Sequence, residues 1–234
     1  PMRAIHVINC AAAIGLLAVA TVSGTLPVEA KCSDRPAAQV DWSRCEKKSL
    51  MLSGSVLDRA GMVAADLSGS DLTQVSLKGA DLTKTNLTST WFVKANLQLT
   101  TFTGAFGTRL RFTEANLTGA DLTKVEFSRV DMALADFTDA NLSQGQLMRA
   151  DFRKAKLLRS RFTGANLTRT VLTGAEMIET DMTGAYLYLT RVEGADLSQV
   201  KGLTQQQVEI ACGDATTLLP PGLSAPKTWP CPAP

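Results

Sequence analysis

The chain has 234 residues, of which 24 are Lys or Arg and 22 are Asp or Glu, so its formal net charge is +2. This balance gives no argument for or against a nucleic-acid partner. One five-residue period covers most of the chain, which excludes two unrelated domains in favour of a single elongated body.

The first thirty residues resemble an export signal. Met2 and Arg3 give a short basic start, residues 10–22 are apolar or small apart from Thr21, and Val28-Glu29-Ala30 offers a cleavage site after Ala30. The alternative is a membrane anchor, but the apolar run is shorter than the ~18 to 20 residues that span a bilayer. We therefore predict a cleaved signal peptide over 1–30, a periplasmic or secreted protein, and no stable membrane insertion after cleavage.

Four cysteines remain after cleavage, two on each side of the repeat and none inside it. In an exported chain this even number predicts disulfides. Three pairings are possible, and we favour Cys32 with Cys45 and Cys212 with Cys231, because a stiff repeat should hold the two pairs apart. Zinc is the weaker alternative, since no histidine remains and no C-x-x-C spacing occurs. Residues 31–49 are then a disulfide cap, with Trp42 suited to sealing the first coil.

Residues 50–200 carry an apolar residue every five positions. Of the thirty central positions from 52 to 197, 29 hold Leu, Met, Phe or Val, and the exception is Gly107. The position two before the centre is mostly small or β-branched, the one before is Asp or Asn in 14 pentads, and the one after is Ser or Thr in 18. A period of five fits neither a helix nor a flat strand, so the backbone must turn a corner in each pentad and coil, with the central side chains inside.

These pentads resemble the pentapeptide-repeat family, whose motif is A-(D/N)-L-x-x. The runs 80–84, 115–119 and 120–124 carry the likeness, which extends over about two-thirds of the chain. The resemblance implies an all-β fold: a right-handed quadrilateral parallel β-helix, a solenoid with four pentads per coil. At Gly107 we expect a structural irregularity, with the inward slot filled from the neighbouring Phe106 or the coil bulged, and we keep a binding notch as the alternative.

After Leu197 the period stops, and residues 201–234 read as a cap. Thr204 and Gln207 have the spacing of a capping box, and Gly213 is expected to end the short helix that they begin. The proline-rich residues beyond predict an extended tail held by Cys231, with a floppy tail as the alternative.

No pattern points to catalysis. Without residues 1–30 the chain has no histidine, and it shows no G-x-S-x-G, phosphate-loop or dinucleotide motif. Its carboxylates recur as the polar position of the repeat, which is turn chemistry. We therefore expect a non-enzymatic protein with no cofactor, no metal and no small-molecule substrate.

Binding is expected on a flat outer face. With four pentads per coil, residues twenty apart stack, so Arg109, Arg129, Arg149 and Arg169 form one outward column suited to an anionic polymer or an acidic protein. Five more basic residues follow on neighbouring sides: Arg153, Lys154, Lys156, Arg159 and Arg161. The alternative is a solvated face in which Asp131 and Asp151 pair with the column.

A second, apolar column suggests a homodimer contact near the C-terminal coils, made by Leu158, Ile178, Tyr186, Tyr188 and Leu189. The family resemblance adds another alternative, a DNA-mimicking protein that interacts with gyrase. Such relatives look like acidic, cytoplasmic mimics of B-DNA, whereas this chain has an export signal and a slightly basic charge. We therefore predict an exported scaffold or binding module with an unknown protein or anionic polymer as partner and consider a nucleic-acid partner unlikely.

Overall fold

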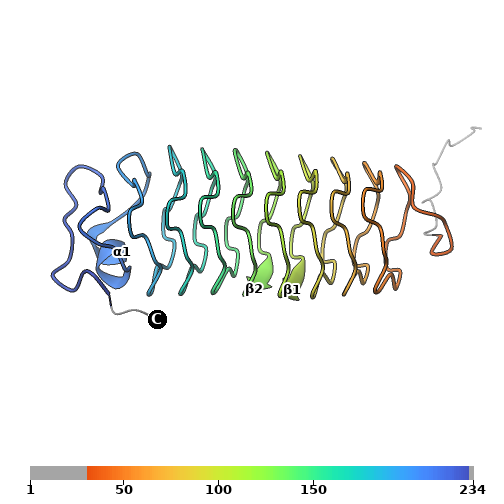
Figure 1. The fold of residues 1–234 in the computed structure, drawn as a ribbon, viewed down its shortest axis with the longest axis horizontal. Coiled ribbons are helices and arrows are strands. Elements are labelled where there is room, and N and C mark those ends of the chain that lie inside the picture. Colours follow the sequence, from red (N-terminus) through yellow and green to blue (C-terminus); the bar gives the residue numbers. More distant parts are fainter. Residues whose placement is uncertain (1–30, 232–234) are drawn as a thin grey trace, which may run out of the picture.

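The computed structural model describes residues 31–231. The predicted signal peptide, 1–30, lies outside the described residues, as do 232–234. Figure 1 shows a stack of coils along one long axis, with a helix at the C-terminal end. The named elements are β1 (Phe106–Thr108), β2 (Glu126–Ser128) and α1 (Gln205–Ile210). The rest of the stack is built from single parallel bridges joined by turns.

The coils repeat every twenty residues. Parallel bridges join each outward position to the one twenty further on, from Asp41 with Gly61 to Asp181 with Lys201. The amide of Leu82, for example, donates to the carbonyl of Thr101 at 2.7 Å. Each coil therefore contains four pentads, and every pentad lies directly over the equivalent pentad of the next coil. The strands of this parallel β-helix are short because each is interrupted by a turn.

The turns explain the residue preferences of the motif. The amide of Ala80 donates to the carbonyl of Leu77 at 2.9 Å, and Gly79 between them has a φ of 66°. This is the pattern of a type II turn, which needs a positive φ at its third residue. The Asp or Asn before each centre caps the turn: Oδ1 of Asp81 accepts from the amide of Thr83 at 2.9 Å. The residue with positive φ stands at the corner of the coil, and its side chain points outward.

Apolar centres fill the interior. Leu82, Leu122 and Leu167 are fully buried. Rings also stack from coil to coil, as with Phe92 and Phe112, whose centroids are 4.9 Å apart. Polar residues in the small inward position are satisfied by the backbone: the hydroxyl of Thr90 donates to the carbonyl of Leu67 at 3.0 Å. The interior is thus a closed stack, and only the outer faces can bind a partner.

At Gly107 the structure shows neither of the two irregularities expected there, a slot filled by Phe106 or a bulged coil. Phe106 does not fill the slot, because its side chain is 42% exposed. The coil is not bulged either, since β1 and β2 pair in regular parallel register. A Cβ on Gly107 would lie 2.8 Å from the amide nitrogen of Thr88 and 3.0 Å from Cδ1 of Leu110. Leu110, buried where the motif usually has Ala, occupies the space beside the missing side chain.

The coil begins earlier than the boundary expected at residue 50. Asp41 already pairs with Gly61, and Trp42 takes a fully buried inward position with its Nε1 donating to the carbonyl of Asp34 at 3.2 Å. The sulfurs of Cys32 and Cys45 lie at disulfide distance, with their Cα atoms 5.5 Å apart, so the segment before the coil is tied to it. The sequence hid this coil because Trp and Cys stand where the motif has Leu and Ala.

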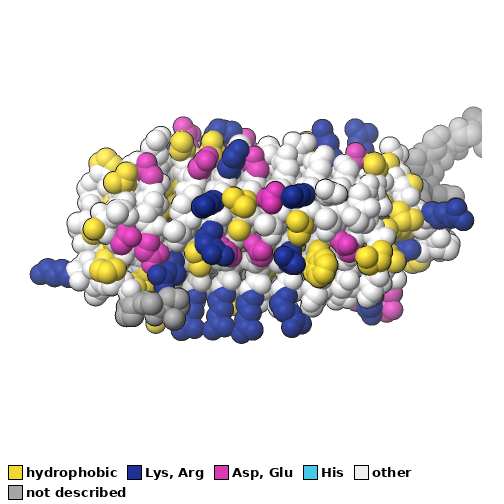
Figure 2. Space-filling model, viewed as in Figure 1, with side chains coloured by type: hydrophobic (Ala, Val, Ile, Leu, Met, Phe, Trp, Pro, Cys, Tyr) yellow, Lys and Arg dark blue, Asp and Glu magenta, His cyan; other side chains and the backbone are white. Residues whose placement is uncertain are grey.

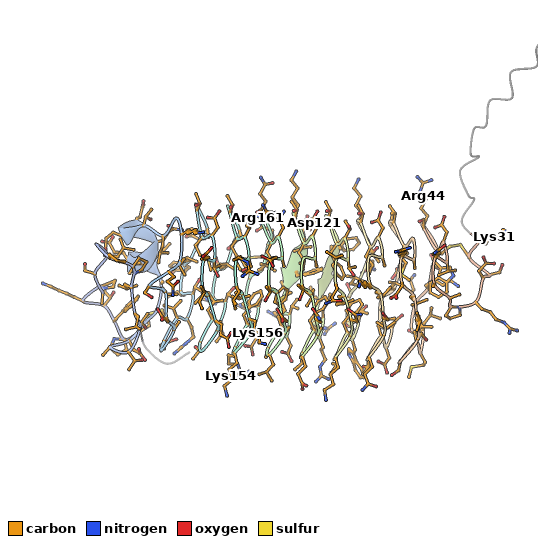
Figure 3. The ribbon with its side chains drawn as sticks, turned by 90° about the horizontal axis from the view of Figure 1, so that it is seen from above. Lys31, Arg44, Asp121, Lys154, Lys156 and Arg161 are labelled. Atoms are coloured by element: carbon orange, nitrogen blue, oxygen red, sulfur yellow. A yellow bond between two sulfur atoms is a disulfide. The ribbon has the colours of Figure 1, made fainter. Side chains whose placement is uncertain are left out.

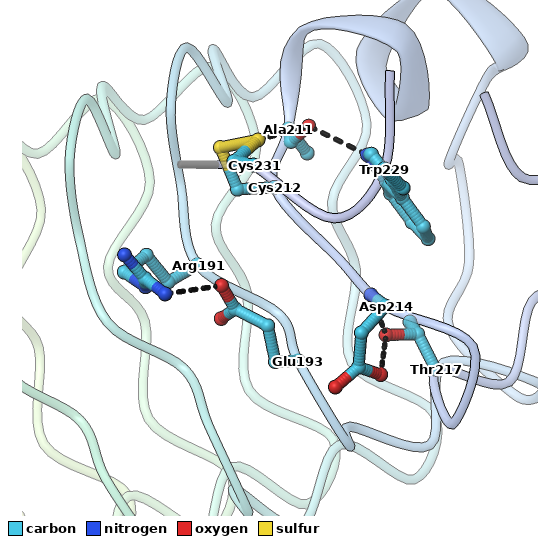
Figure 4. The surroundings of a disulfide bond; sticks show 8 residues. All are labelled: Arg191, Glu193, Ala211, Cys212, Asp214, Thr217, Trp229 and Cys231. Atoms are coloured by element: carbon cyan, nitrogen blue, oxygen red, sulfur yellow. Dashed lines mark hydrogen bonds and ion pairs between the residues drawn. A yellow bond between two sulfur atoms is a disulfide. The ribbon is translucent and has the colours of Figure 1, made fainter. Parts of the chain in front are cut away.

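At the other end α1 covers the last coil. Thr204 and Gln207 form the predicted capping box, but the helix ends at Ala211 in extended conformation, so the expectation that Gly213 ends it is wrong. Gly213 instead lies against the ring of Trp229. Figure 4 shows how the tail is held: Trp229 Nε1 donates to the carbonyl of Ala211 at 2.8 Å, and Cys231 pairs with Cys212. These are the two cysteine pairs favoured from the sequence.

Candidate functional site

The four arginines of the predicted column lie at one corner of four successive coils. Each follows a segment of the same face, as Arg109 follows β1 and Arg129 follows β2. All four have positive φ, between 54° and 59°, and exposed side chains. Ladder neighbours in a sheet are ~4.8 Å apart, so the four side chains leave the backbone at an even spacing. We call Arg109, Arg129, Arg149 and Arg169 the arginine row.

Figure 2 shows the corresponding edge of the molecule. Dark blue Lys and Arg side chains project side by side along the lower edge of the view, the edge that carries β1 and β2 in Figure 1. The stack thus brings together, on one line, residues that are separated by twenty positions in the sequence.

No carboxylate pairs with the arginine row within residues 31–231. Asp151 binds Arg153, with Nε of the arginine 2.9 Å from Oδ2. Asp131 accepts hydrogen bonds from the hydroxyl of Thr113 at 2.9 Å and from the amide of Ala133 at 3.1 Å. The alternative in which Asp131 and Asp151 neutralise the row is therefore not what the structure shows. The ion pairs of the described chain use other cations: Lys48, Lys94, Arg153, Arg159, Arg191 and Lys201.

A shallow depression runs beside the row. It has a volume of about 500 Å³ and is lined by three of the arginines together with Ser128, Met148, Thr168 and Tyr188. A second depression of about 370 Å³ continues it towards the N-terminus, shares Ser128 and Met148, and is lined also by Phe106 and Gly107. Gly107 thus lines a surface depression in addition to its place in the core, and the binding notch kept as its alternative role stays a prediction.

The lining residues beside the row were missed in the sequence. Each of them directly precedes a residue of the column that holds the row, at the same twenty-residue spacing. The four arginines are preceded by Thr108, Ser128, Met148 and Thr168, and Leu189 in the next coil is preceded by Tyr188. Their types vary, so they give no repeat signal. Reading the column next to the arginines in steps of twenty would have found them.

The other predicted basic residues are compensated or lie elsewhere. Oδ1 of Asp139 is 2.7 Å from Nε of Arg159, and the hydrogen bond from this arginine holds the pKa of Asp139 below its usual value. Burial raises the pKa of Asp121. Hydrogen bonds from Thr123 and Thr103 and the charge of Arg161 lower this pKa by more than burial raises it, so the net shift is downward. Figure 3 shows Arg161 beside Asp121, on a different side of the stack from Lys154.

The apolar residues suggested as a dimer contact do not form one patch. Leu158 and Ile178 stand in the pentad column whose bridge joins Lys156 to Glu176, whereas Tyr186 and Tyr188 belong to the column that pairs Asn166 with Tyr186. Two pentads, half a coil, separate these columns. The tyrosine rings instead stack on each other, with centroids 6.3 Å apart, at the end of the depression beside the arginine row.

Residues 31–231 hold no group of three or more His, Cys, Asp or Glu side chains placed to bind a metal ion. None of the helices in this part of the chain has the length and apolar character needed to cross a membrane.

The fold is similar to that of the solved structure of QnrB1, and a second structure, HetL, matches with a lower score. QnrB1, a plasmid-mediated fluoroquinolone resistance protein, is 16% identical, with a TM-score of 0.53 over 76% of this chain and 90% of its own. HetL, involved in heterocyst differentiation regulation in the cyanobacterium Nostoc sp., is 23% identical, with a TM-score of 0.45 over 82% of this chain and 94% of its own. No curated protein matches the chain significantly.

The family model for pentapeptide repeats matches the chain with eight copies. The matched residues are 60–98 and four overlapping segments, 111–145, 131–169, 146–184 and 160–199. They cover more than half of the sequence and coincide with the coils described above. The chain therefore belongs to the pentapeptide-repeat family.

Proposed function

We propose that this protein is an exported, non-enzymatic binding module that holds a polyanionic partner, an anionic polymer or an acidic protein, along the arginine row. One observation carries the proposal: four exposed arginines stand in line with no carboxylate partner among residues 31–231, while Arg153 and Arg159 elsewhere on the stack are paired. Guanidinium groups bind carboxylates and phosphates through two parallel hydrogen bonds, so a line of them suits a ligand with repeated anionic groups.

The energetics favour a ligand with several charges. A single exposed ion pair is worth only ~0.2 to 1 kcal/mol, so one anion bound to one arginine is weakly held. Neighbouring cations about 5 Å apart in water repel each other by about 0.8 kcal/mol, before screening by salt. A polymer that spans the row makes four contacts and removes three such repulsions at once. Linked contacts on one backbone then give an affinity that no single contact provides.

Export and the finer details of the fold form part of the proposal. Residues 1–30 are proposed as a cleaved signal peptide, and two cysteine pairs at disulfide distance support an oxidising compartment. The proposed organisation is a disulfide-tied N-terminal segment from residue 31, a right-handed, four-sided β-helix that begins near Asp41 and continues to residue 200, and a helix with a disulfide-tied tail over 201–234. Twenty-residue spacing of the bridges supports four sides per coil.

The test replaces all four row arginines by Gln and measures retention of the mature chain on an anionic matrix at low salt. The matched control removes four cations that have partners: Lys94, Arg153, Arg159 and Lys201. Both variants lose the same net charge. We expect early elution for the row variant and a much smaller change for the control. Equal retention of the row variant and the unmodified chain would dismiss the proposal.

The gyrase-interacting alternative predicts the opposite surface. A mimic of B-DNA needs a face of closely spaced negative charges, and the row is positive. A supercoiling assay with DNA gyrase and the mature chain tests this alternative, and inhibition or protection of the enzyme would restore it in place of polyanion binding.

A further inference from the structure

The arginine row has a second component that a simple anion-binding line does not need. Tyr188 lies in the same depression as Arg129, Arg149 and Arg169, and its carbonyl accepts from the amide of Arg169 at 2.9 Å. The ring is 44% exposed and stacks against Tyr186 at an interplanar angle of 17°. Leu189 then replaces arginine in the next coil, so the row ends where the aromatic pair begins.

We infer that the row binds an extended acidic polysaccharide, with uronate carboxylates on alternate arginines and a sugar ring against Tyr188. This inference rests on the proposed function and names the class of its ligand. It follows from the spacing of the charges, from the chemistry of the floor beside them, and from the position of the aromatic pair.

The spacing favours a chain whose repeating unit matches one coil. The β-ladder fixes the row as a straight line with steps of ~4.8 Å. The phosphates of one strand in duplex DNA advance by only ~3.4 Å along the axis and wind around it, so they leave a straight row after a few steps. A pyranose in an equatorially linked, extended chain advances by nearly the length of one coil. Successive sugars of such a chain are turned by about half a rotation, so every second carboxylate faces the row and stays in step with alternate arginines.

The floor beside the row suits sugar hydroxyl groups and C–H faces. Thr108 and Ser128 offer hydroxyls that make no side-chain hydrogen bond to any residue in 31–231, and Met148 lies between Ser128 and Thr168 in the column. Such a surface alternates polar contacts with small apolar ones, as the edge of a sugar chain does. The exposed ring of Tyr188 supplies a flat apolar surface against which the C–H face of a pyranose can be buried.

The aromatic residues argue against a single-stranded nucleic acid. Proteins that hold such strands place aromatic rings along the groove so that successive bases stack on them. Here Ser128, Met148 and Thr168 occupy the middle of the column, and the tyrosines stand only at its C-terminal end. Bases would therefore find stacking surfaces only at the two ends of the row, at Phe106 and at Tyr188, and none over its middle.

The experiment measures binding of a β-1,4-linked mannuronate octamer by isothermal titration calorimetry at low salt. Polyglutamate with the same number of carboxylates and a single-stranded oligonucleotide serve as comparison ligands. The variants are the four Arg→Gln substitutions together, Tyr188→Ser, and Trp91→Ser as the control. Trp91 is also an exposed aromatic residue, 45% exposed; it packs near Arg111 and does not line the depressions beside the row. Circular dichroism and thermal melting confirm that each variant is folded.

We expect the octamer to bind, the four Arg→Gln substitutions to abolish binding, and Tyr188→Ser to weaken it by about threefold to tenfold. Tyr188→Ser should leave polyglutamate binding unchanged, because that polymer has no sugar ring, and Trp91→Ser should change neither.

Four results would overturn the inference. Row-dependent binding of polyglutamate without binding of the octamer leaves the proposed function intact and removes the polysaccharide. Tighter, Tyr188-dependent binding of the oligonucleotide assigns the face to nucleic acid instead. Unchanged octamer affinity in Tyr188→Ser removes the sugar-ring contact. If none of the three polymers binds, the inference and the proposed function are both wrong.

Discussion

Two corners of this stack have the same backbone conformation but different charge patterns, one uniformly positive and one alternating in sign. The arginine row occupies the positive-φ position of one pentad column, and Asp139, Arg159 and Glu179 occupy the same position half a coil away. In that second column the charges alternate, and Arg159 binds Asp139 through two hydrogen bonds of 2.7 Å. The comparison teaches that the coil only places side chains in line. The identity of each twentieth residue decides whether a line neutralises itself or remains available to a partner.

The largest expected effect is a loss of stability when the buried ring packing that both corners depend on is disrupted. Phe112 packs against Phe92 and Phe102, with centroid distances of 4.9 and 6.0 Å, and is fully buried. Phe112→Ala should lower the free energy of unfolding by about 3 to 5 kcal/mol, because it removes buried area and leaves a cavity. Urea unfolding followed by circular dichroism measures the loss. The exposed Trp91→Ala is the control, and an equal loss there would contradict the role of the ring stack.

The second effect converts one corner into the other. Arg129→Glu with Arg169→Glu gives the row alternating signs, so polyanion affinity should fall by at least tenfold as repulsive contacts replace attractive ones. The free energy of unfolding should rise by a few tenths of a kcal/mol, since neighbouring like charges disappear. The reverse change, Asp139→Arg with Glu179→Arg, should create a second row. Retention on an anionic matrix compares the variants, and failure of the reverse change to raise retention would show that alignment alone is insufficient.

Salt provides a smaller and more quantitative test of how many arginines act. If all four contact a flexible polyanion, the logarithm of the association constant should fall with the logarithm of salt concentration with a slope of about −3. Arg109→Gln alone should reduce the slope by about 0.7. Titrations at several salt concentrations measure both slopes. A slope near zero would show that the charges contribute little to binding.

The smallest effect concerns pH at the paired corner. The pKa of Asp139 is lowered by its hydrogen bond from Arg159, so the folded state binds a proton there less readily than the unfolded chain. This contribution to stability is present above the unfolded pKa of about 3.9 and is lost as the pH falls through the lower folded pKa. Arg159→Gln should flatten this part of the profile. Thermal melts from pH 5 to pH 2 measure it, and Lys154→Gln serves as the control because Lys154 takes part in no ion pair of the described chain.

The period of five predicted the interior of this fold because burial imposes it on every pentad. Leu82, Leu122 and Leu167 are inside for the reason that the motif gives. The ends followed no such rule: Trp42 fills the first coil in place of Leu, and Gly213 makes room for Trp229 instead of ending a helix. These positions depend on contacts with residues distant in sequence, which no local pattern records.

The candidate site divides in the same way. The alignment of Arg109 with Arg169 follows from counting in twenties, since the ladder fixes the register. The choice of Asp151 between Arg149 and Arg153 does not, because both lie two residues away and only side-chain geometry selects Arg153. The place of Tyr188 beside the row also follows from counting in twenties, but its stacking on Tyr186 depends on side-chain geometry that the sequence does not record.

Helix α1 also limits the length of the coil stack. Nε2 of Gln207 donates to the carbonyls of Met182 and Ala185, at 2.9 and 2.8 Å, and so occupies acceptors that another coil could have used. Copies of the chain are thereby hindered from joining end to end at this terminus into a fibre. The arginine row is therefore limited to four positions, and a longer polyanion bound as proposed above would need further copies of the protein along its length.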